Sequence, residues 1–257
     1  LIVWLPDMFV LLSPAKKLRA PSTQLSTTVP VFETDVAELV QKLQGLTVQR
    51  VQKLMSLSEN LASLNFERFQ TFGNQAEASG PAALLFNGDT YAGLAADQWD
   101  QSDFEFAQVH VGILSGLYGI LAPLDLAEPY RLEMGTRLET ARGKSLYEFW
   151  GDKISEEINR RLEINGENTV INLASKEYFS AVSLKTLKAR VITPTFKEMR
   201  DGKPKIISFM AKKARGLMCD YIVRQRIVDV ADLSSFNAGG YAFSEALSTS
   251  EKPTFIR

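Results

Sequence analysis

The sequence predicts a single compact domain of the α+β class that spans residues 8–257. Its 257 residues are 45% hydrophobic and 23% charged, a composition that can bury a sizeable core. Strand-like runs and helical periodicities follow one another without the regular strand–helix–strand rhythm of a doubly wound sheet. No internal repeat, low-complexity tract or linker divides the chain.

We expect residues 1–7 to be an upstream extension, because the strand-like run FVLL begins only after Met8. The apolar stretch at the N-terminus is 12 residues long and is interrupted by Pro6 and Asp7. A membrane span needs roughly 20 residues, and a secretory signal needs a basic start and a cleavage site of small residues. We therefore expect a cytoplasmic protein with no membrane partner.

The first half of the domain is predicted to contain one strand and three helices. Phe9–Leu12 is a short buried strand that ends at Ser13-Pro14, and a loop follows over 17–31. Apolar residues at helical spacing predict a helix that contains residues 36–43 and a second that contains 51–55, and Ser58 is a candidate cap for a third. Residues 82–86 are another short apolar run, and the turn signal Asn87-Gly88-Asp89 follows it.

The second half alternates helices and strands. Residues 103–114 are predicted to be helical and to lead into a glycine-containing stretch. Apolar residues recur every four positions over 146–162 and predict one long helix, closed by Asn165-Gly166. We expect strands at 170–173, 189–196 and 205–209, and a last long helix over about 211–226.

The scarcity of cysteine and histidine excludes several kinds of site. Cys219 is the only cysteine, so no intramolecular disulfide can form, and His110 is the only histidine. Zinc and iron sites that need several such ligands cannot be built, so we expect no bound metal and no cofactor. A lone histidine in a helical stretch is more often a packed residue than a catalyst, and we interpret His110 in that way.

The charge of the chain is unevenly distributed, although the formal net charge is only −1. Residues 81–130 contain no Lys or Arg, whereas residues 185–226 contain twelve basic and three acidic residues. A basic segment of this kind can be a solvated helix face with a charged loop. It can also be the footprint of a phosphate-binding surface.

Five basic residues are the candidates for anion binding: Lys16, Arg131, Lys212, Lys213 and Arg215. Lys16 follows a buried strand and a stiff proline turn, at the strand end where open sheets often bind ligands. Arg131 lies two positions before Glu133, and a structural ion pair is the alternative reading. The other three open the last helix, where cations oppose the helix dipole unless an anion is present.

The stretch LSGLYGILAPLD at 114–125 raises a separate question, because Gly116 and Gly119 interrupt an apolar run. Glycine weakens a regular element by roughly 0.5–1 kcal/mol, so the chain must either turn with positive φ here or approach something closely. The first is a structural need. The second can be a ligand such as a phosphate.

An ordered set of motifs resembles the YaaA family of bacterial peroxide-stress-resistance proteins. The motifs are SPAKKL, NGDTYAGL, LSGLYGILAPLD, PYRLEMGTRL, YEFWGD, INLASKEYF, KIISFMAKKARG and FNAGGYAF. The resemblance covers nearly all of residues 8–257. It implies a compact mixed fold, a DNA-binding element of the helix-hairpin-helix type, and a cytoplasmic role in limiting peroxide and iron damage to DNA. It implies no settled enzymatic reaction.

We expect this element at about 103–128, with helices at 103–114 and 122–128 and a hairpin over 115–119 that contains Gly116, Tyr118 and Gly119. The usual motif separates its two glycines by one residue, whereas two residues separate them here. The element contains no basic residue, so charge must come from the five candidates above. The resulting hypothesis is sequence-independent DNA binding.

The alternative is an enzyme that acts on a nucleotide or another phosphorylated small molecule, with Glu133 as the acid/base group. Direct iron sequestration is disfavoured by the scarcity of His and Cys. A broad basic groove would favour DNA, and a deep basic pocket would favour the enzyme.

Overall fold

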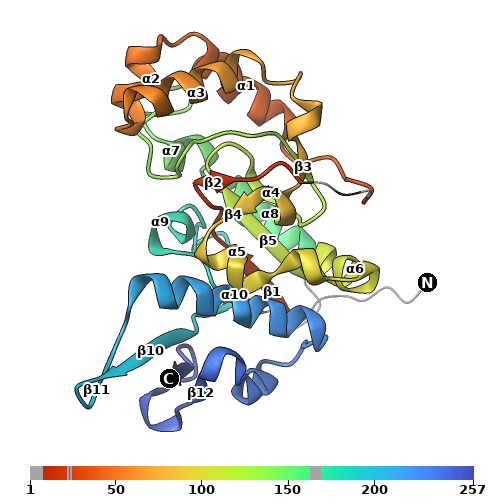
Figure 1. Cartoon of the computed structure of the whole chain (residues 1–257), viewed down its shortest axis with the longest axis vertical. Helices are drawn as coiled ribbons and strands as arrows, with labels where there is room; N and C mark the ends of the chain where they lie inside the picture. Colours follow the sequence, from red (N-terminus) through yellow and green to blue (C-terminus); the bar gives the residue numbers. More distant parts are fainter. Residues whose placement is uncertain (1–7, 22, 24, 163–168) are drawn as a thin grey trace.

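The computed structural model describes residues 8–21, 23, 25–162 and 169–257. Three parts follow one another along the longest axis of the molecule in Figure 1. Three helices lie at one end: α1 (Glu33–Gln44), α2 (Val48–Met55) and α3 (Glu59–Gln70). A five-stranded sheet occupies the middle, and a four-stranded sheet lies at the other end. The predicted single compact domain of mixed helices and strands is confirmed.

The central sheet has the strand order β6-β5-β1-β8-β9. Its members are β1 (Met8–Leu12), β5 (Val111–Ser115), β6 (Gly119–Leu121), β8 (Thr169–Asn172) and β9 (Arg190–Ile192). β1 is parallel to both β5 and β8, and β8 is parallel to β9, whereas β6 is antiparallel to β5. All five residues of β1 are buried, which explains the continuous apolar run MFVLL.

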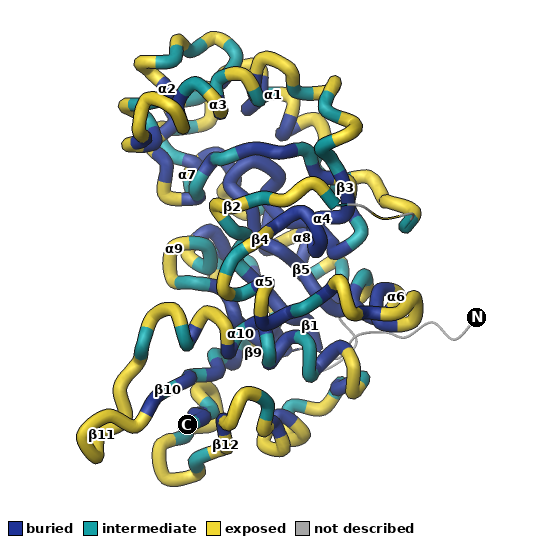
Figure 2. Tube along the Cα trace, viewed as in Figure 1, coloured by how far each residue is buried: buried dark blue, intermediate teal, exposed yellow. Residues whose placement is uncertain are grey.

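Two helices pack against β1, and the first of them starts at a clear signal. α6 (Gln101–His110) begins with a reciprocal capping box between Asp100 and Asp103. α8 (Lys153–Leu162) directs Ile154, Ile158 and Leu162 into the core. Figure 2 shows the sheet region as the most continuously buried part of the chain.

The second sheet has the order β11-β10-β13-β12 and lies beside the long helix α10 (Ser208–Arg224). Its strands are β10 (Thr195–Arg200), β11 (Lys203–Lys205), β12 (Ala242–Phe243) and β13 (Thr254–Ile256). The remaining short elements are β2 (Lys17–Leu18), β3 (Gly80–Pro81), α4 (Ala82–Leu85), β4 (Phe86–Asn87), α5 (Asp89–Leu94), β7 (Leu126–Ala127), α7 (Leu146–Trp150) and α9 (Lys176–Phe179). Short 3₁₀ turns lie at Ala76–Ala78, Ala96–Gln98, Val230–Ser235, Ala238–Gly240 and Glu245–Leu247.

α10 is held against the centre of the molecule by a close crossing with α5. A Cβ built on Gly93 would lie 2.1 Å from the Lys213 carbonyl oxygen, and one on Gly216 would lie 1.8 Å from the Thr90 carbonyl oxygen. Glycine at both positions therefore lets the two helix backbones touch. This crossing fixes where α10 places its side chains.

Several predicted elements differ from the structure in their boundaries. The predicted long helix over 146–162 is two helices, because the chain turns at Gly151 with a φ of 49°. The predicted end of that helix at Asn165-Gly166 lies outside the described residues, as does the predicted extension at 1–7. The predicted strand over 205–209 is wrong at its C-terminal end, because α10 already starts at Ser208.

The predicted helix-hairpin-helix at 103–128 is wrong. α6 ends at His110, and residues 111–121 form a β-hairpin in which Ser115 pairs with Gly119. No helix lies over 122–128. Pairing of Val111–Ile113 with β1 outweighs the local helical pattern, because it buries the apolar run in the centre of the sheet.

Close packing and a positive φ, rather than a ligand, require glycine at the two positions of this turn. A Cβ on Gly116 would lie 2.2 Å from the Leu132 carbonyl oxygen. Gly119 has a φ of 70° and faces the rings of Trp150 and Phe32. Tyr118 is buried, and burial raises the pKa of its phenol. A phosphate cannot reach this turn, so Gly116, Tyr118 and Gly119 do not form a phosphate site.

Candidate functional site

A cavity of about 650 Å³ opens at the carboxyl ends of β1 and β8. Its walls come from five segments that are far apart in the sequence: 13–17, 87–90, 130–133, 173–178 and the start of α10. The chain leaves β1 toward β5 on one side and leaves β8 toward β9 on the other. Open sheets bind ligands at such a switch point, outside the carboxyl ends of the strands.

The turn after β1 is fixed from three directions. The Ser13 hydroxyl accepts a hydrogen bond from the Ser175 backbone N–H at 2.8 Å, and the Tyr91 hydroxyl donates to the Ser13 carbonyl at 3.1 Å. The ring of Pro14 fixes its own φ, directly after Ser13. The turn therefore holds Lys16 at the rim of the cavity, where its side chain is 61% exposed.

Glu133 is held between two cations in the cavity wall. Its carboxylate lies 2.7 Å from the Lys16 Nζ and 2.9 Å from the Arg131 Nη2. Burial alone would raise the pKa of Glu133, but the hydrogen bonds from Lys16 and Arg131 outweigh it and lower that pKa below its usual 4.5. The predicted pair of Arg131 and Glu133 is therefore an ion pair inside the cavity.

The Arg131 side chain is 17% exposed, and its guanidinium is only partly satisfied. The Nε atom is buried and has no hydrogen-bond partner among the described residues. An arginine presents its donors in a rigid fork that suits phosphate or carboxylate oxygens. Arg131 thus has an unsatisfied, solvent-shielded donor beside its ion pair with Glu133.

α10 contributes two further cations, Lys212 and Arg215. Arg215 is half-buried, and this burial lowers the pKa of its guanidinium. Within the described part of the chain, neither residue makes an ion pair or a side-chain hydrogen bond. A half-buried guanidinium without a counter-charge is unfavourable unless an anion joins it.

The lining as a whole is basic. Six basic residues face three acidic ones: Lys16, Lys17, Arg131, Lys176, Lys212 and Arg215 against Asp89, Glu133 and Glu177. Two of the carboxylates are already engaged, because Glu177 accepts a hydrogen bond from the Gly135 N–H at 3.0 Å and Glu133 holds two cations. The arrangement can attract and hold an anion.

The structure brings together four of the residues that the sequence predicted: Lys16, Arg131, Lys212 and Arg215. Lys213 is not among them. It is exposed and lines a separate cavity of about 120 Å³ beside Tyr241 and Arg257. The cavity lining also contains Ser175 and Lys176, which the sequence did not predict. They follow the buried strand β8 much as Ser13 and Lys16 follow β1.

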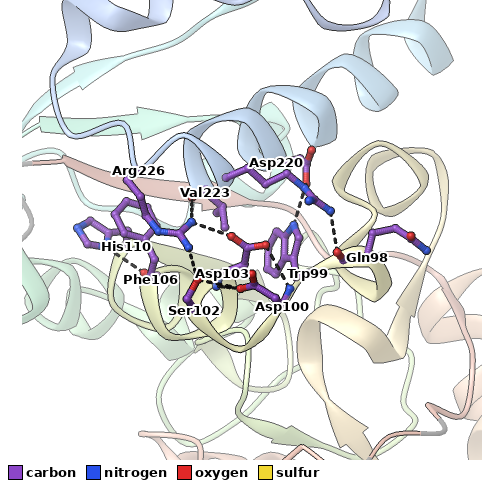
Figure 3. Close-up of polar contacts among 11 residues, drawn as sticks. Gln98, Trp99, Asp100, Ser102, Asp103, Phe106, His110, Asp220, Val223 and Arg226 are labelled. Carbon is purple, nitrogen blue, oxygen red and sulfur yellow. Dashed lines mark hydrogen bonds and ion pairs between the residues drawn. The ribbon is translucent and has the colours of Figure 1, made fainter.

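The far end of the basic segment has a structural role. Figure 3 shows Arg226 bonded to Asp103 at 2.8 Å and to the Ser102 hydroxyl at 2.7 Å, while Asp220 accepts from Trp99 Nε1 at 2.7 Å. Arg224 donates to Asp220 at 3.0 Å and to the Gln98 carbonyl at 2.8 Å. These contacts tie the C-terminal end of α10 to the acidic region around α6. They do not involve Lys212 and Arg215, which line the cavity from the N-terminal half of α10.

The residue His110 is packed, as its lone position suggested. It is 1% exposed and stacks on Phe106 with ring centroids 3.9 Å apart. In the part of the chain that the structure describes, no group of three or more His, Cys, Asp or Glu residues could hold a metal ion. No helix among those residues is long and apolar enough to span a membrane.

Comparison with known proteins places the chain among close relatives. It is 49% identical over 252 residues to a UPF0246 protein of Ruegeria pomeroyi, covering 97% of this chain and 98% of that protein. It is 50% identical over 255 residues to a UPF0246 protein of Cereibacter sphaeroides, covering 97% and 99%. Residues 8–247 match the family model described as peroxide stress protein YaaA. The chain therefore belongs to the peroxide stress protein YaaA family.

Proposed function

We propose that this peroxide stress protein binds a phosphorylated small molecule in the cavity at the ends of β1 and β8. The observation that carries the proposal is Arg215, a half-buried guanidinium without a counter-charge among the described residues. The cavity of about 650 Å³ lies in the range of small-molecule sites, which is about 300–1,000 Å³. A duplex groove would be far broader.

The remaining cations fit the same ligand. Glu133 holds Lys16 and Arg131 in place, and Arg131 keeps a free Nε donor. Arginines bind phosphate through paired N–H donors, and lysines add charge without fixing geometry. We propose Arg215 and Arg131 as the binding pair and Lys212 and Lys16 as the flanking charges.

We propose binding rather than turnover. A general acid or base works best with a pKa near the working pH, and the pKa of Glu133 is lowered instead. Its two cation partners stabilise the charged carboxylate. In this proposal Glu133 orients cations and does not transfer protons.

The test is calorimetric titration of the parent and of Arg215→Gln with inorganic phosphate, AMP and ADP. A hydrogen bond to a charged group contributes about 1.5–3 kcal/mol, so the variant should bind about 10- to 100-fold more weakly. Lys42→Gln on exposed α1 removes the same charge away from the cavity and should leave affinity unchanged. Equal affinity of the parent and Arg215→Gln for every probe would contradict the proposal.

We also propose that the protein binds duplex DNA in the cytoplasm without sequence preference and so limits peroxide and iron damage. The supporting observation lies in the link between α2 and α3, residues Ser56-Leu57-Ser58. Ser56 is left-handed with a φ of 51°, Leu57 is buried and Ser58 is the N-cap of α3. Two small residues separated by one apolar residue match the helix-hairpin-helix spacing that the glycine stretch lacks.

This link offers backbone groups to a phosphate. Ser58 makes no side-chain capping bond, so the amides of the first turn of α3 have no side-chain partner there. Arg50 and Lys53 are exposed on α2 and add charge nearby. Because such contacts reach phosphates and not bases, they give sequence-independent binding.

A duplex titration over a range of salt concentrations tests this second proposal. Contact with about two phosphates gives a log–log slope near −1.8. Ser58→Asp keeps a good N-cap but repels phosphate, so it should weaken binding to all sequences alike. Arg215→Gln serves as the control and should leave duplex binding unchanged. If Arg215→Gln weakens duplex binding and Ser58→Asp does not, the DNA contact belongs to the cavity instead.

A further inference from the structure

The strands β10 and β11 form a two-stranded ribbon that projects from the end of the molecule (Figures 1 and 2). They pair in antiparallel fashion around Asp201-Gly202, two residues with positive φ that form a tight turn. Every residue of β11 is exposed. β10 also pairs with β13 through residues 195–197, so only the end of the ribbon around Asp201-Gly202 extends beyond the sheet. An isolated two-stranded ribbon is only marginally stable in water, so the sequence of this end is informative about what it contacts.

The pairing gives the ribbon two unlike faces. Residues directly opposite each other in an antiparallel pair point to the same side. Arg200 lies opposite Lys203 at the end of the ribbon, so the exposed end of one face is basic. Lys205 lies opposite Glu198 on the same face, where the buried Glu198 carboxylate pairs with Arg257. Met199 lies opposite Pro204, next to the Arg200–Lys203 pair, so the other face is apolar at this end of the ribbon.

Further apolar side chains continue beyond the ribbon toward α10. Ile206 is 61% exposed, Phe209 in the first turn of α10 is 57% exposed, and Met199 is 46% exposed. Such large side chains are normally buried when they cluster. Lys205 contacts Asp201 at 3.5 Å, while Arg200 and Lys203 form no ion pair with any residue that the structure describes.

We propose that the β10–β11 ribbon, together with Ile206 and Phe209, docks on an anionic lipid surface. The apolar face enters the boundary between headgroups and acyl chains, and the basic residues reach the phosphates. Long basic side chains can extend to the headgroups while apolar neighbours sit deeper. The expectation of no membrane partner rested on the lack of a spanning segment, which a surface-lying ribbon does not require.

Two other occupants fit less well. A stable dimer buries about 800 Å² on each partner, whereas four partly exposed side chains offer on the order of 300 Å². A nucleic acid would use the basic face but would leave Met199 and Ile206 in water, because aliphatic side chains do not stack well on bases. A bilayer accommodates both faces at once.

The test is co-sedimentation of the full chain with vesicles of phosphatidylcholine and phosphatidylglycerol, and with vesicles of phosphatidylcholine alone. We expect binding to the mixed vesicles only. Each basic residue near such a surface contributes about five-fold in partitioning, so the double reversal Arg200→Glu with Lys203→Glu should abolish sedimentation. Lys42→Glu with Lys144→Glu makes the same change in charge at exposed positions away from the ribbon and should leave vesicle binding intact.

Insertion is measured separately from adsorption. Ile206→Cys labelled with an environment-sensitive fluorophore should show a blue shift on the mixed vesicles, because the native Cys219 is buried and does not compete for label. Ile206→Asn with Phe209→Ser should reduce binding about ten-fold. Circular dichroism and thermal unfolding confirm that each variant is folded.

Three results would overturn the proposal. The first is no sedimentation of the parent with mixed vesicles. The second is binding that the ribbon variants leave unchanged. The third is loss of duplex or single-stranded DNA binding in the ribbon variants with no vesicle binding by the parent, which would assign the ribbon to nucleic acid.

Discussion

Substitution of Gly216 by alanine tests whether the crossing of α5 and α10 positions the cavity. Gly216 lies one residue after Arg215, on the side of α10 that touches α5. A Cβ there would lie 1.8 Å from the Thr90 carbonyl oxygen and 2.6 Å from the Leu94 nitrogen. Both neighbours are backbone atoms of α5 and cannot rotate away. The helices must separate by roughly 1.5 Å to reach ordinary contact distance.

The expected loss follows from two opposing effects. Overpacking a tight contact destabilises by about 1–3 kcal/mol, and backbone neighbours place Gly216→Ala at the upper end. Replacing glycine by alanine inside a helix gains about 1 kcal/mol. We therefore expect the free energy of unfolding to fall by about 2 kcal/mol. For a chain of this size that is a decrease in Tm of about 4–8 °C.

Urea unfolding followed by circular dichroism measures this change. Gly45→Ala is the matched control, because Gly45 follows α1 with a φ of −74° and a Cβ there would meet atoms no closer than 3.6 Å. The Gly216 variant should also bind phosphate more weakly, since moving α10 displaces Lys212 and Arg215. Equal stability of Gly216→Ala and Gly45→Ala would show that α5 and α10 can move apart at no cost, which would refute this reasoning.

Two other outcomes follow from the packing and charges. Gly116→Ala should lower the free energy of unfolding by about 1–3 kcal/mol in urea melts, because its Cβ would lie 2.2 Å from the Leu132 carbonyl oxygen; a melt equal to that of Gly45→Ala would contradict this. Asp35→Asn should cost about 1–3 kcal/mol at neutral pH, because it removes the buried carboxylate that pairs with Arg142 and accepts from Lys153 at 2.6 Å. Burial raises the pKa of Asp35, but these two partners lower it overall, so its contribution is present at neutral pH and is lost as the pH falls below 3.8. The free energy of unfolding, measured from neutral pH to below pH 3.8, should fall more steeply for the parent than for Asp35→Asn. Equal slopes for the two proteins would show that the ion pairs of Asp35 do not contribute to stability.

The elements that the sequence predicted well are those whose signal is local. The run MFVLL is apolar at every position and forms the central strand β1. The helices α1 and α2 follow from apolar spacing, and Ser58 marks the start of α3. Lys16 could be singled out because it follows a proline turn. Arg215 was singled out as part of a helix start, but α10 begins at Ser208, so Arg215 lies inside the helix.

The elements that were missed depend on distant partners. Residues 111–115 continue the helical pattern of α6, but they pair with β1 more than 90 residues away. Gly112 was an available signal, since a Cβ there would lie 2.9 Å from the ring of Phe9. The contribution of Ser175 and Lys176 to the cavity could not be inferred, because it requires β8 to lie beside β1. Only tertiary pairing creates that neighbourhood.

The central position of β1 has a consequence for how the chain folds during synthesis. Met8 pairs with Thr169 and Val10 with Val111, so β1 leaves the ribosome before both of its neighbours and must wait for them. Parallel pairing at such separation is slow and leaves an apolar strand uncovered in the meantime. The nascent MFVLL segment is therefore a natural client for a chaperone that recognises short hydrophobic peptides. The cavity at the ends of β1 and β8 is not complete until Arg215 has emerged, so truncated translation products would lack one of its walls.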